Sequence, residues 1–244
     1  MNNYEYCAFV ARSIFPDRKN IRVLDYGCGA GHVVKLLLAD GFDAWGCDVF
    51  YDGGNYSGQV VDGLLGSRVQ RIVDNRIPYG DASFDLVISN QVLEHVADMD
   101  VVLGEMKRVL KPDGHTFHMF PDKSVWREGH CGIAFLHWFP KRNFKLRLAY
   151  AYLARSLGFG FHKKGKTRMT WARDFCDWLD KWTHYRPYRQ IKSSFHRHFG
   201  PLAHREEEWI ELRYPISKVF PKVIKILVSR KWGGLVFVSR KSAT

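Results

Sequence analysis

The sequence predicts an α/β protein whose core is a doubly wound, mostly parallel β-sheet. Short apolar, β-prone runs alternate with stretches that carry the apolar spacing of helices. Residues 84–89 form a continuous apolar run, which is typical of a parallel strand covered on both faces. Glycines follow the first run directly, as in strand–loop–helix units that bind a ligand at the edge of a sheet.

The first 120 residues are expected to alternate strands with helices. Residues 22–26 form the first strand, Gly27, Gly29 and Gly31 a tight loop, and residues 33–38 the apolar stripe of a helix. Further strands are expected at 43–49, 68–73, 84–89 and 115–120, and a helix at 98–110, closed by the Lys-Pro-Asp-Gly turn at 111–114. This alternation favours parallel pairing.

The second half changes character at Pro121. Residues 126–168 are rich in aromatic and basic side chains and are expected to form an inserted lid. Helices are expected at 143–157, 170–182 and 188–199, a turn at 158–166, and the last strands within 227–238. Because no repeat or flexible linker divides the chain, we expect one domain, 1–244, made of a ligand-binding core (1–122), a helical insertion or lid (123–205) and C-terminal strands that complete the sheet (206–244).

The composition indicates a soluble, cytoplasmic protein. Apolar residues make up 46% of the 244 residues and charged residues 25%, and no window approaches the roughly 18–20 apolar residues of a membrane span. The first 16 residues lack the basic start and apolar core of a secretory signal. The five cysteines are widely spaced and odd in number, which favours free thiols.

Charge is divided unevenly along the chain. Residues 1–120 hold 11 Lys and Arg against 16 Asp and Glu, whereas residues 121–244 hold 26 against 9, so the net charges are −5 and +17. The basic half is expected to face an anionic partner: a nucleic acid, a phosphate- or lipid-linked glycan carrier, or the inner face of a membrane. Solubility alone is the competing explanation.

The glycine loop and Asp48 predict a site for a nucleoside-containing ligand. Glycines allow a ligand to approach the backbone at the end of a strand. A nicotinamide dinucleotide fingerprint, G-x-G-x-x-G, needs its third glycine at position 32, which is His32 here. Asp48 ends the second strand, where a carboxylate can accept hydrogen bonds from both ribose hydroxyls, in an adenosyl ligand as in a dinucleotide.

Four motifs stand in order along the first half of the chain. They are Val-Leu-Asp-Tyr-Gly-Cys-Gly-Ala-Gly at 23–31, Pro-Tyr-Gly-Asp-Ala-Ser-Phe-Asp-Leu-Val at 78–87, Leu-Glu-His-Val at 93–96 and Leu-Lys-Pro-Asp-Gly at 110–114. Together they resemble the class I S-adenosylmethionine-dependent methyltransferases of the type 11-like branch. The resemblance implies a seven-stranded Rossmann-like sheet, a helical, basic insertion after the fifth strand and S-adenosylmethionine as the cofactor. Beyond residue 122 the chain is loosely similar to methyltransferases of bacterial surface glycans.

The resemblance also implies a set of cofactor-binding residues. They are Asp25, Gly27, Gly29, Gly31, Asp48, Val49, Phe50, Asp74, Asn75 and Asn90. The glycine loop and the aspartate before it would line the methionine part, Asp48 would hold the ribose, and Val49 or Phe50 would pack on the adenine. Asp74, with its neighbour, would bind the adenine amino group, and Asn90 would border the methionine amino and carboxylate groups. A turn or strand-end role is an equal alternative for both asparagines.

Four residues are candidates for the acceptor side of the site. His95, after the fourth strand, can serve as a base for an alcohol acceptor or can fix its own loop. Glu128, His130 and His137 share a Gly-broken, Trp-rich loop after the fifth strand, which suits a sugar pocket. For these three we rank acceptor binding first, packing second and metal ligation third, because no H-E-x-x-H spacing is present, and we predict no metal.

The sequence therefore predicts a cytoplasmic S-adenosylmethionine-dependent methyltransferase. Its acceptor is expected to be a sugar-containing or other small molecule that is O-methylated on a surface-polysaccharide pathway, with peripheral contact to the inner membrane face as an option. A nucleic-acid methyltransferase is the enzymatic alternative, favoured by the basic half but lacking an N-P-P-[YF] motif. A non-enzymatic binding protein that retains the cofactor fold is the third candidate.

Overall fold

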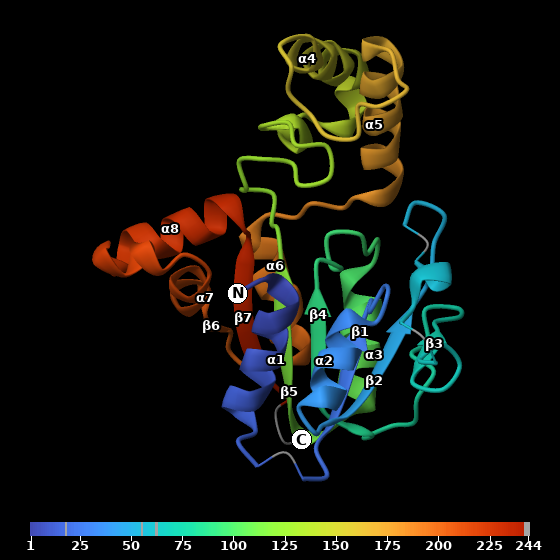
Figure 1. Cartoon of the computed structure of the whole chain (residues 1–244), viewed down its shortest axis with the longest axis vertical. Coiled ribbons are helices and arrows are strands. Elements are labelled where there is room, and N and C mark those ends of the chain that lie inside the picture. Colours follow the sequence, from blue (N-terminus) through green and yellow to red (C-terminus); the bar gives the residue numbers. More distant parts are fainter. Residues whose placement is uncertain (18, 55, 62, 242–244) are drawn as a thin grey trace.

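The computed structural model describes residues 1–17, 19–54, 56–61 and 63–241, which contain a seven-stranded sheet (Figure 1). The strand order is β3-β2-β1-β4-β5-β7-β6. Strands β1 to β5 pair in parallel, whereas β7 runs antiparallel to β5 and β6. The strands are β1 (Arg22–Tyr26), β2 (Asp43–Asp48), β3 (Val69–Arg71), β4 (Phe84–Asn90), β5 (Leu110–Phe120), β6 (Ala203–His204) and β7 (Leu235–Arg240). The expected mostly parallel α/β class is confirmed.

Helices cover both faces of the sheet. On one face, Trp209 and Ile210 join a core with residues of α1 and α2. On the other face, Ile191 and Phe195 are buried together with α3. These helices are α1 (Asn3–Ile14), α2 (His32–Ala39), α3 (Met99–Val109), α6 (Tyr188–His198) and α7 (Glu206–Arg213). Two covered faces explain why the central strands are apolar on both sides.

A helical layer lies beyond the carboxyl ends of the parallel strands (Figure 1). It contains α4 (Phe144–Ser156) and α5 (Arg168–Trp182), which pack around their own small core. The insertion expected at 123–205 extends too far toward the C-terminus. α6 buries Phe195 against the sheet and β6 pairs with β7, so these two elements belong to the sheet domain and not to the insertion. We call residues 123–182 the lid and residues 183–187, which return the chain to the sheet, the strap.

The C-terminal region holds fewer strands than expected. Residues 206–244 contain α7, then α8 (Lys222–Trp232), and only the strand β7 among the described residues. The apolar run at 227–238 is therefore helix in its first half and strand in its second. Leu227 and Val228 lie four residues after Val223 and Ile224, and this spacing is typical of a helix. Gly233 and Gly234 separate the two elements, and Gly234 has a positive φ of 97°.

Two other elements depart from the expectations. α1 was not expected, although Asn2 and Glu5 form a capping box at its start. β5 begins at Leu110 rather than at His115, because Leu110 pairs with Phe84 ahead of a β-bulge. All five cysteines are buried free thiols, as expected.

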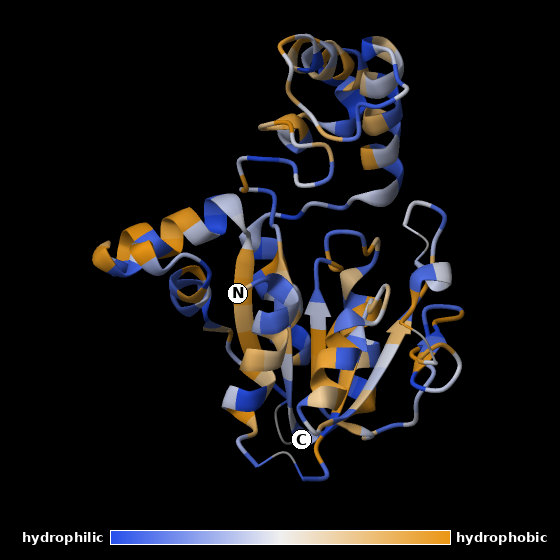
Figure 2. Cartoon of the chain, viewed as in Figure 1, coloured by the Kyte–Doolittle hydropathy of each residue, from blue (hydrophilic) through white to orange (hydrophobic). Residues whose placement is uncertain are grey.

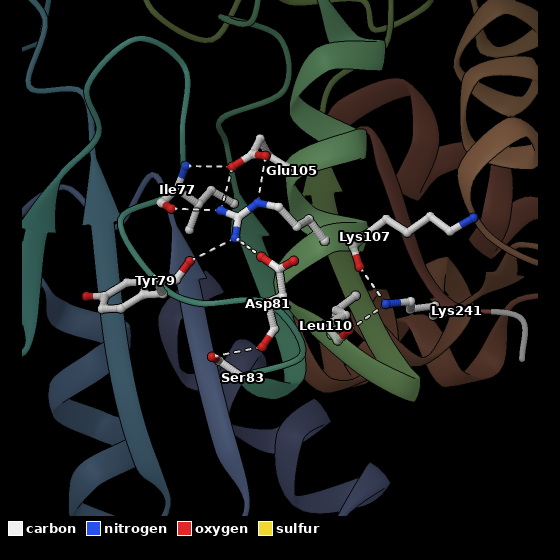
Figure 3. Close-up of polar contacts among 9 residues, drawn as sticks. Ile77, Tyr79, Asp81, Ser83, Glu105, Lys107, Leu110 and Lys241 are labelled. Carbon is white, nitrogen blue, oxygen red and sulfur yellow. Dashed lines mark hydrogen bonds and ion pairs between the residues drawn. The ribbon is translucent and has the colours of Figure 1, made fainter. Parts of the chain in front are cut away.

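A polar network ties the segment before β4 to the last turn of α3 (Figure 3). Arg108 donates hydrogen bonds to Asp81 at 2.6 Å, to the carbonyl oxygen of Ile77 at 2.9 Å and to Glu105 at 2.7 Å. Lys241, just after β7, donates to the carbonyl oxygen of Leu110 at 2.6 Å. Asp81, in the motif at 78–87, is thus joined to α3, and Leu110, in the motif at 110–114, is joined to the residue after β7.

Candidate active site

The loop between β1 and α2 folds around three glycines with positive φ. The φ angles are 73° at Gly27, 51° at Gly29 and 79° at Gly31. A Cβ atom at Gly27 would lie 2.4 Å from the side chain of Val92, so the close approach of the two loops requires glycine there. The N–H groups of Gly27 and Cys28 donate to the carbonyl oxygen of Cys47, which fixes the loop at the carboxyl end of β1. The helix α2 that follows has no side-chain cap, so a ligand can bind its first N–H groups.

Asp48 joins this loop to the turn after β2. Its carboxylate accepts hydrogen bonds from the backbone N–H of Gly29 and of Phe50, each at 2.8 Å. The side chain is 8% exposed, at the edge of the sheet where β1 and β2 end. A carboxylate has about four acceptor positions, so lone pairs remain for the hydroxyls of a ligand.

Two more polar groups are buried at the same edge, the carboxyl group of Asp25 and one side-chain atom of Asn90. Burial, and then the charge of Asp48, raises the pKa of Asp25 well above its ordinary value. The Oδ1 atom of Asn90 is buried and has no hydrogen-bond partner among the described residues. An unpaired buried acceptor costs about 1–3 kcal/mol. A cationic ligand group that donates hydrogen bonds, such as the ammonium of S-adenosylmethionine, therefore fits this edge.

The remaining cofactor candidates differ in exposure. Phe50 is buried with a φ of 49°, whereas Val49 is 39% exposed and is the one accessible to a ligand. Asp74 and Asn75 are exposed and form a two-residue turn, with φ angles of 51° and 57°, between the bridged residues Val73 and Arg76. Such turns favour Asn and Asp for backbone reasons. Their contact with adenine stays a prediction.

Glu94 and His95 lie in the loop after β4. The Nδ1–H of His95 donates to the carbonyl oxygen of Trp182 at 2.7 Å, which leaves Nε2 with a lone pair, 3.9 Å from Glu94. Burial lowers the pKa of His95 to about 4 and raises the pKa of Glu94 to about 7. Neither carboxylate oxygen of Glu94 has a hydrogen-bond partner among the described residues, although both are buried.

Glu128 and His130 come from the lid loop after β5. Glu128 is fully buried and accepts hydrogen bonds from His130 Nδ1 at 2.6 Å, Tyr185 at 2.7 Å and the backbone N–H of Cys131 at 2.6 Å. Burial alone would raise the pKa of Glu128, but the hydrogen bond and charge of His130 hold it at about 2. Burial opposes a charge on His130 as well, yet the bond to Glu128 raises its pKa. Glu128 is therefore the acceptor that holds the ring of His130 in place.

The loop after β4 and the lid meet at the two imidazole rings. The ring of His130 lies 4.9 Å from that of His95 and 4.8 Å from Trp178 of α5. Tyr51 packs against Trp182 at 4.8 Å and lies 6.1 Å from His95. Because Tyr51 follows Asp48 by three residues, it connects the cofactor edge to this group. We call Glu94, His95, Glu128 and His130 the histidine cluster.

His137 lies apart from the His95–His130 contact. It is buried in a short 3₁₀ turn (Leu136–Trp138), its ring 4.6 Å from that of Tyr185, and burial lowers its pKa to about 4. The two tryptophans expected in a sugar pocket have other neighbours, since Trp126 packs on Trp232 and Trp138 donates to the carbonyl oxygen of Val125. The indoles nearest to the cluster belong to α5.

Sequence reasoning missed four residues of this site. Glu94 stands in the Leu-Glu-His motif, and a carboxylate in a buried segment was a usable signal. Tyr51, Trp178 and Tyr185 have no motif, and only tertiary packing brings them to the cluster.

The chain belongs to the methyltransferase-domain family, because a family model with this description matches residues 2–199. This confirms the resemblance to class I S-adenosylmethionine-dependent methyltransferases. Two curated relatives are ubiquinone biosynthesis O-methyltransferases. The enzyme of Photorhabdus laumondii is 30% identical over 123 residues, which are 47% of this chain and 50% of the relative. The enzyme of Yersinia pestis is 30% identical over 98 residues, which are 39% of this chain and 40% of the relative. The chain spans about half the length of the curated relatives it matches, or less.

Solved structures share the fold. An S-adenosylmethionine-dependent methyltransferase from Mesorhizobium loti has a TM-score of 0.57 and 17% identity, covering 96% of this chain and 98% of that one. Phosphoethanolamine N-methyltransferase 2 from Haemonchus contortus, in complex with S-adenosyl-L-methionine, has a TM-score of 0.51 and 16% sequence identity. The match covers 98% of this chain and 52% of that one. The [4+2]-cyclase SpnF has a TM-score of 0.53 and 16% sequence identity, and the match covers 98% of this chain and 81% of that one. At these identities the likeness concerns the fold alone.

Proposed function

We propose that the protein methylates a small-molecule acceptor bound between the cofactor edge and the histidine cluster, with S-adenosylmethionine as the methyl donor. One observation carries this proposal: a chain of the methyltransferase-domain family holds a glycine loop fastened to Asp48. The unpaired Oδ1 of Asn90 supports a donor-bearing ligand at the same edge.

The arrangement of residues suits the demands of methyl transfer. When bound, S-adenosylmethionine supplies a methyl carbon that an acceptor lone pair displaces from sulfur. The chain has to align the acceptor, exclude water and stabilise the acceptor once its proton has left. In this proposal the lid excludes water, and the histidine cluster receives the acceptor oxygen.

We propose O-methylation, in agreement with the names of the curated relatives. A sugar-containing acceptor on a surface-polysaccharide pathway remains our finer proposal from the sequence. A phenolic acceptor is the alternative to screen beside it, since both present a hydroxyl group. Nucleic acid ranks behind both, and a cytoplasmic location stays part of the proposal.

Calorimetry with S-adenosylmethionine tests the function first. We expect saturable, one-to-one binding that is lost in Asp48→Ala and retained in Asp17→Ala, an exposed aspartate before the amino-terminal end of β1, whereas the glycine loop follows the carboxyl end of that strand. Binding that survives in Asp48→Ala would contradict the assignment of the cofactor edge. No binding by the folded wild type would leave a protein that keeps only the fold.

Membrane contact is the part of the proposal that concerns the outer surface. No helix among the described residues is long and apolar enough to cross a bilayer. Figure 2 shows hydrophobic residues along α4. Leu146 and Leu153 of this helix and Leu157 at its C-cap are 57%, 58% and 69% exposed. Arg142, just before the helix, and Lys145 in its first turn are exposed basic residues. We propose that this face of α4 contacts an anionic bilayer, as amphipathic basic helices do.

Vesicle sedimentation tests this contact. The wild type should co-sediment with vesicles containing phosphatidylserine, and the double variant Leu153→Glu, Leu157→Glu should not. The matched control is Val223→Glu on α8, where the side chain is 77% exposed. Loss of binding in the control alone would move the contact to α8, and no lipid dependence would end the proposal.

A further inference from the structure

The histidine cluster contains the donor set of a cation site. Glu94, His95 and His130 each offer one ligand atom, and these atoms lie within 4.8 Å of one another. We propose that Glu94, Nε2 of His95 and Nε2 of His130 bind one divalent transition-metal cation. This trio differs from the set considered from the sequence, because Glu94 replaces Glu128 and His95 replaces His137.

The hydrogen bonds of both histidines support this assignment. His95 donates from Nδ1 to the carbonyl oxygen of Trp182, and His130 donates from Nδ1 to Glu128. Each bond fixes the ring and leaves Nε2 as the available nitrogen. Metal-bound histidines in proteins almost always have such a partner on the other nitrogen, either a carbonyl oxygen or a carboxylate. Glu128 is therefore the residue that orients His130.

The unsatisfied carboxylate of Glu94 is the second, independent observation. The residue is 2% exposed, and both of its oxygens are buried without a hydrogen-bond partner among the described residues. Protonation would remove the charge, but the new O–H would still need an acceptor. A cation bound by His95 and His130 gives the carboxylate its partner.

The spacing and chemistry suit a cation of the Zn²⁺ or Mn²⁺ kind. Ligand atoms about 2.1 Å from one tetrahedral cation lie about 3.4 Å apart, so the longest separation in the trio has to shorten by about 1.4 Å, which small side-chain rotations can supply. Two imidazole nitrogens and one carboxylate are typical of transition-metal sites, whereas Mg²⁺ prefers oxygen ligands. Three protein ligands leave coordination positions open.

The open positions give the cation a role in the proposed function. A hydroxyl oxygen of the acceptor bound there would lose its proton more readily, because the cation stabilises the oxyanion. This role rests on methyl transfer being the activity. The cation site itself does not, and cation binding can be measured without any acceptor.

Calorimetry of the chelator-treated protein with Mn²⁺ tests the site. Mn²⁺ is the probe because it has low affinity for thiols, so the buried cysteines do not compete. We expect one equivalent to bind, Glu128→Gln to weaken the affinity about 10–100-fold, and His130→Ala to weaken it more than about 100-fold. Zn²⁺ should bind at the same stoichiometry, and Mg²⁺ should bind more weakly than Mn²⁺.

His196→Ala is the matched control, because His196 is exposed on α6. It should bind Mn²⁺ as the wild type does. Equal affinity in the wild type and in His130→Ala, or no binding by the folded wild type, would overturn the proposal. Circular dichroism verifies the fold of each variant, and His130→Ala decides the matter if a Glu94→Gln variant fails to fold. S-adenosylmethionine titrated into the same samples separates failure of the cation site from failure of the proposed function.

Discussion

The cofactor edge and the histidine cluster are neighbouring sites built in opposite ways. The cofactor edge draws most of its residues from one short stretch, 25–50, and main-chain groups satisfy Asp48. The histidine cluster combines residues from the loop after β4 and the lid, is held by Tyr185 of the strap, and leaves Glu94 unsatisfied. At the cofactor edge the acidic group, Asp48, has its partners in the protein alone, whereas the buried carboxylate of the cluster still needs a partner.

The difference teaches which of the two sites is preformed. Backbone hydrogen bonds hold the glycine loop in a single conformation, so cofactor binding needs little rearrangement. The cluster has a buried carboxylate whose cost is relieved only by an added ligand. Substitutions should therefore separate the sites: those at the cofactor edge should change cofactor affinity, and those in the cluster should change turnover.

The largest effect is expected from Gly27→Ala. The new Cβ would lie 2.4 Å from Val92, in a backbone with a φ of 73°. Gly41→Ala is the matched control, since Gly41 has a φ of 89° but no atom within 4 Å of its added Cβ. Both variants should lose about 1–2 kcal/mol of unfolding free energy from the backbone. Gly27→Ala should lose about 1–3 kcal/mol more, together with cofactor binding. Urea unfolding and calorimetry measure both, and equal losses in the two variants would refute the close approach.

A smaller effect, confined to turnover, is expected from Glu128→Gln. The amide keeps the size of the carboxylate but loses the charge that pairs with His130. We expect turnover to fall about 10–100-fold, as for other residues that orient an active-site histidine. The dissociation constant for S-adenosylmethionine should stay unchanged. A parallel loss of cofactor affinity would show that the two sites are not separable.

The smallest effect is expected between pH 7 and pH 6, from His118 of the sheet. This histidine is fully buried, accepts or donates a hydrogen bond with Ser89 at 2.8 Å, and burial lowers its pKa to about 3. Below about pH 6.5 the unfolded chain binds a proton at this position that the folded protein does not. Stability should therefore fall as the pH falls from about 6.5 toward 3, by at most about 1.4 kcal/mol per pH unit.

His118→Gln should make the decline with pH shallower. Thermal melts of the wild type and the variant at pH 7, 6 and 5 measure the difference. Parallel curves would mean that His118 takes up a proton in the folded state. His137, whose pKa burial lowers to about 4, offers a comparison from the lid.

The sequence predicted the core well because its signals are local. The strand at 22–26 and the loop of Gly27, Gly29 and Gly31 lie where expected, since alternating elements and glycine conformations depend on adjacent residues. The stretch 227–238 was misread because an apolar run of this length fits a helix or a strand, and only packing decides.

The histidine cluster was only half predictable. His95, Glu128 and His130 were identified as candidates, but their grouping requires the strap and α5, which no local pattern specifies. His137, from the same lid loop, proved to pack on Tyr185 instead. Residue type thus indicated which side chains carry chemistry, and tertiary contacts determined which of them meet.

The strap also determines when the site can form during synthesis. His184 donates its backbone N–H to the carbonyl oxygen of Glu94 at 2.6 Å, and Arg186 donates to the carbonyl oxygen of Val96 at 2.7 Å. These bonds link residues about 90 positions apart, so their closure must await most of the chain. A nascent chain that has not yet reached the strap already contains the residues of β1 to β5 and of the glycine loop. It cannot yet fasten Glu94, so the residues of the cofactor edge leave the ribosome before the acceptor side can be completed.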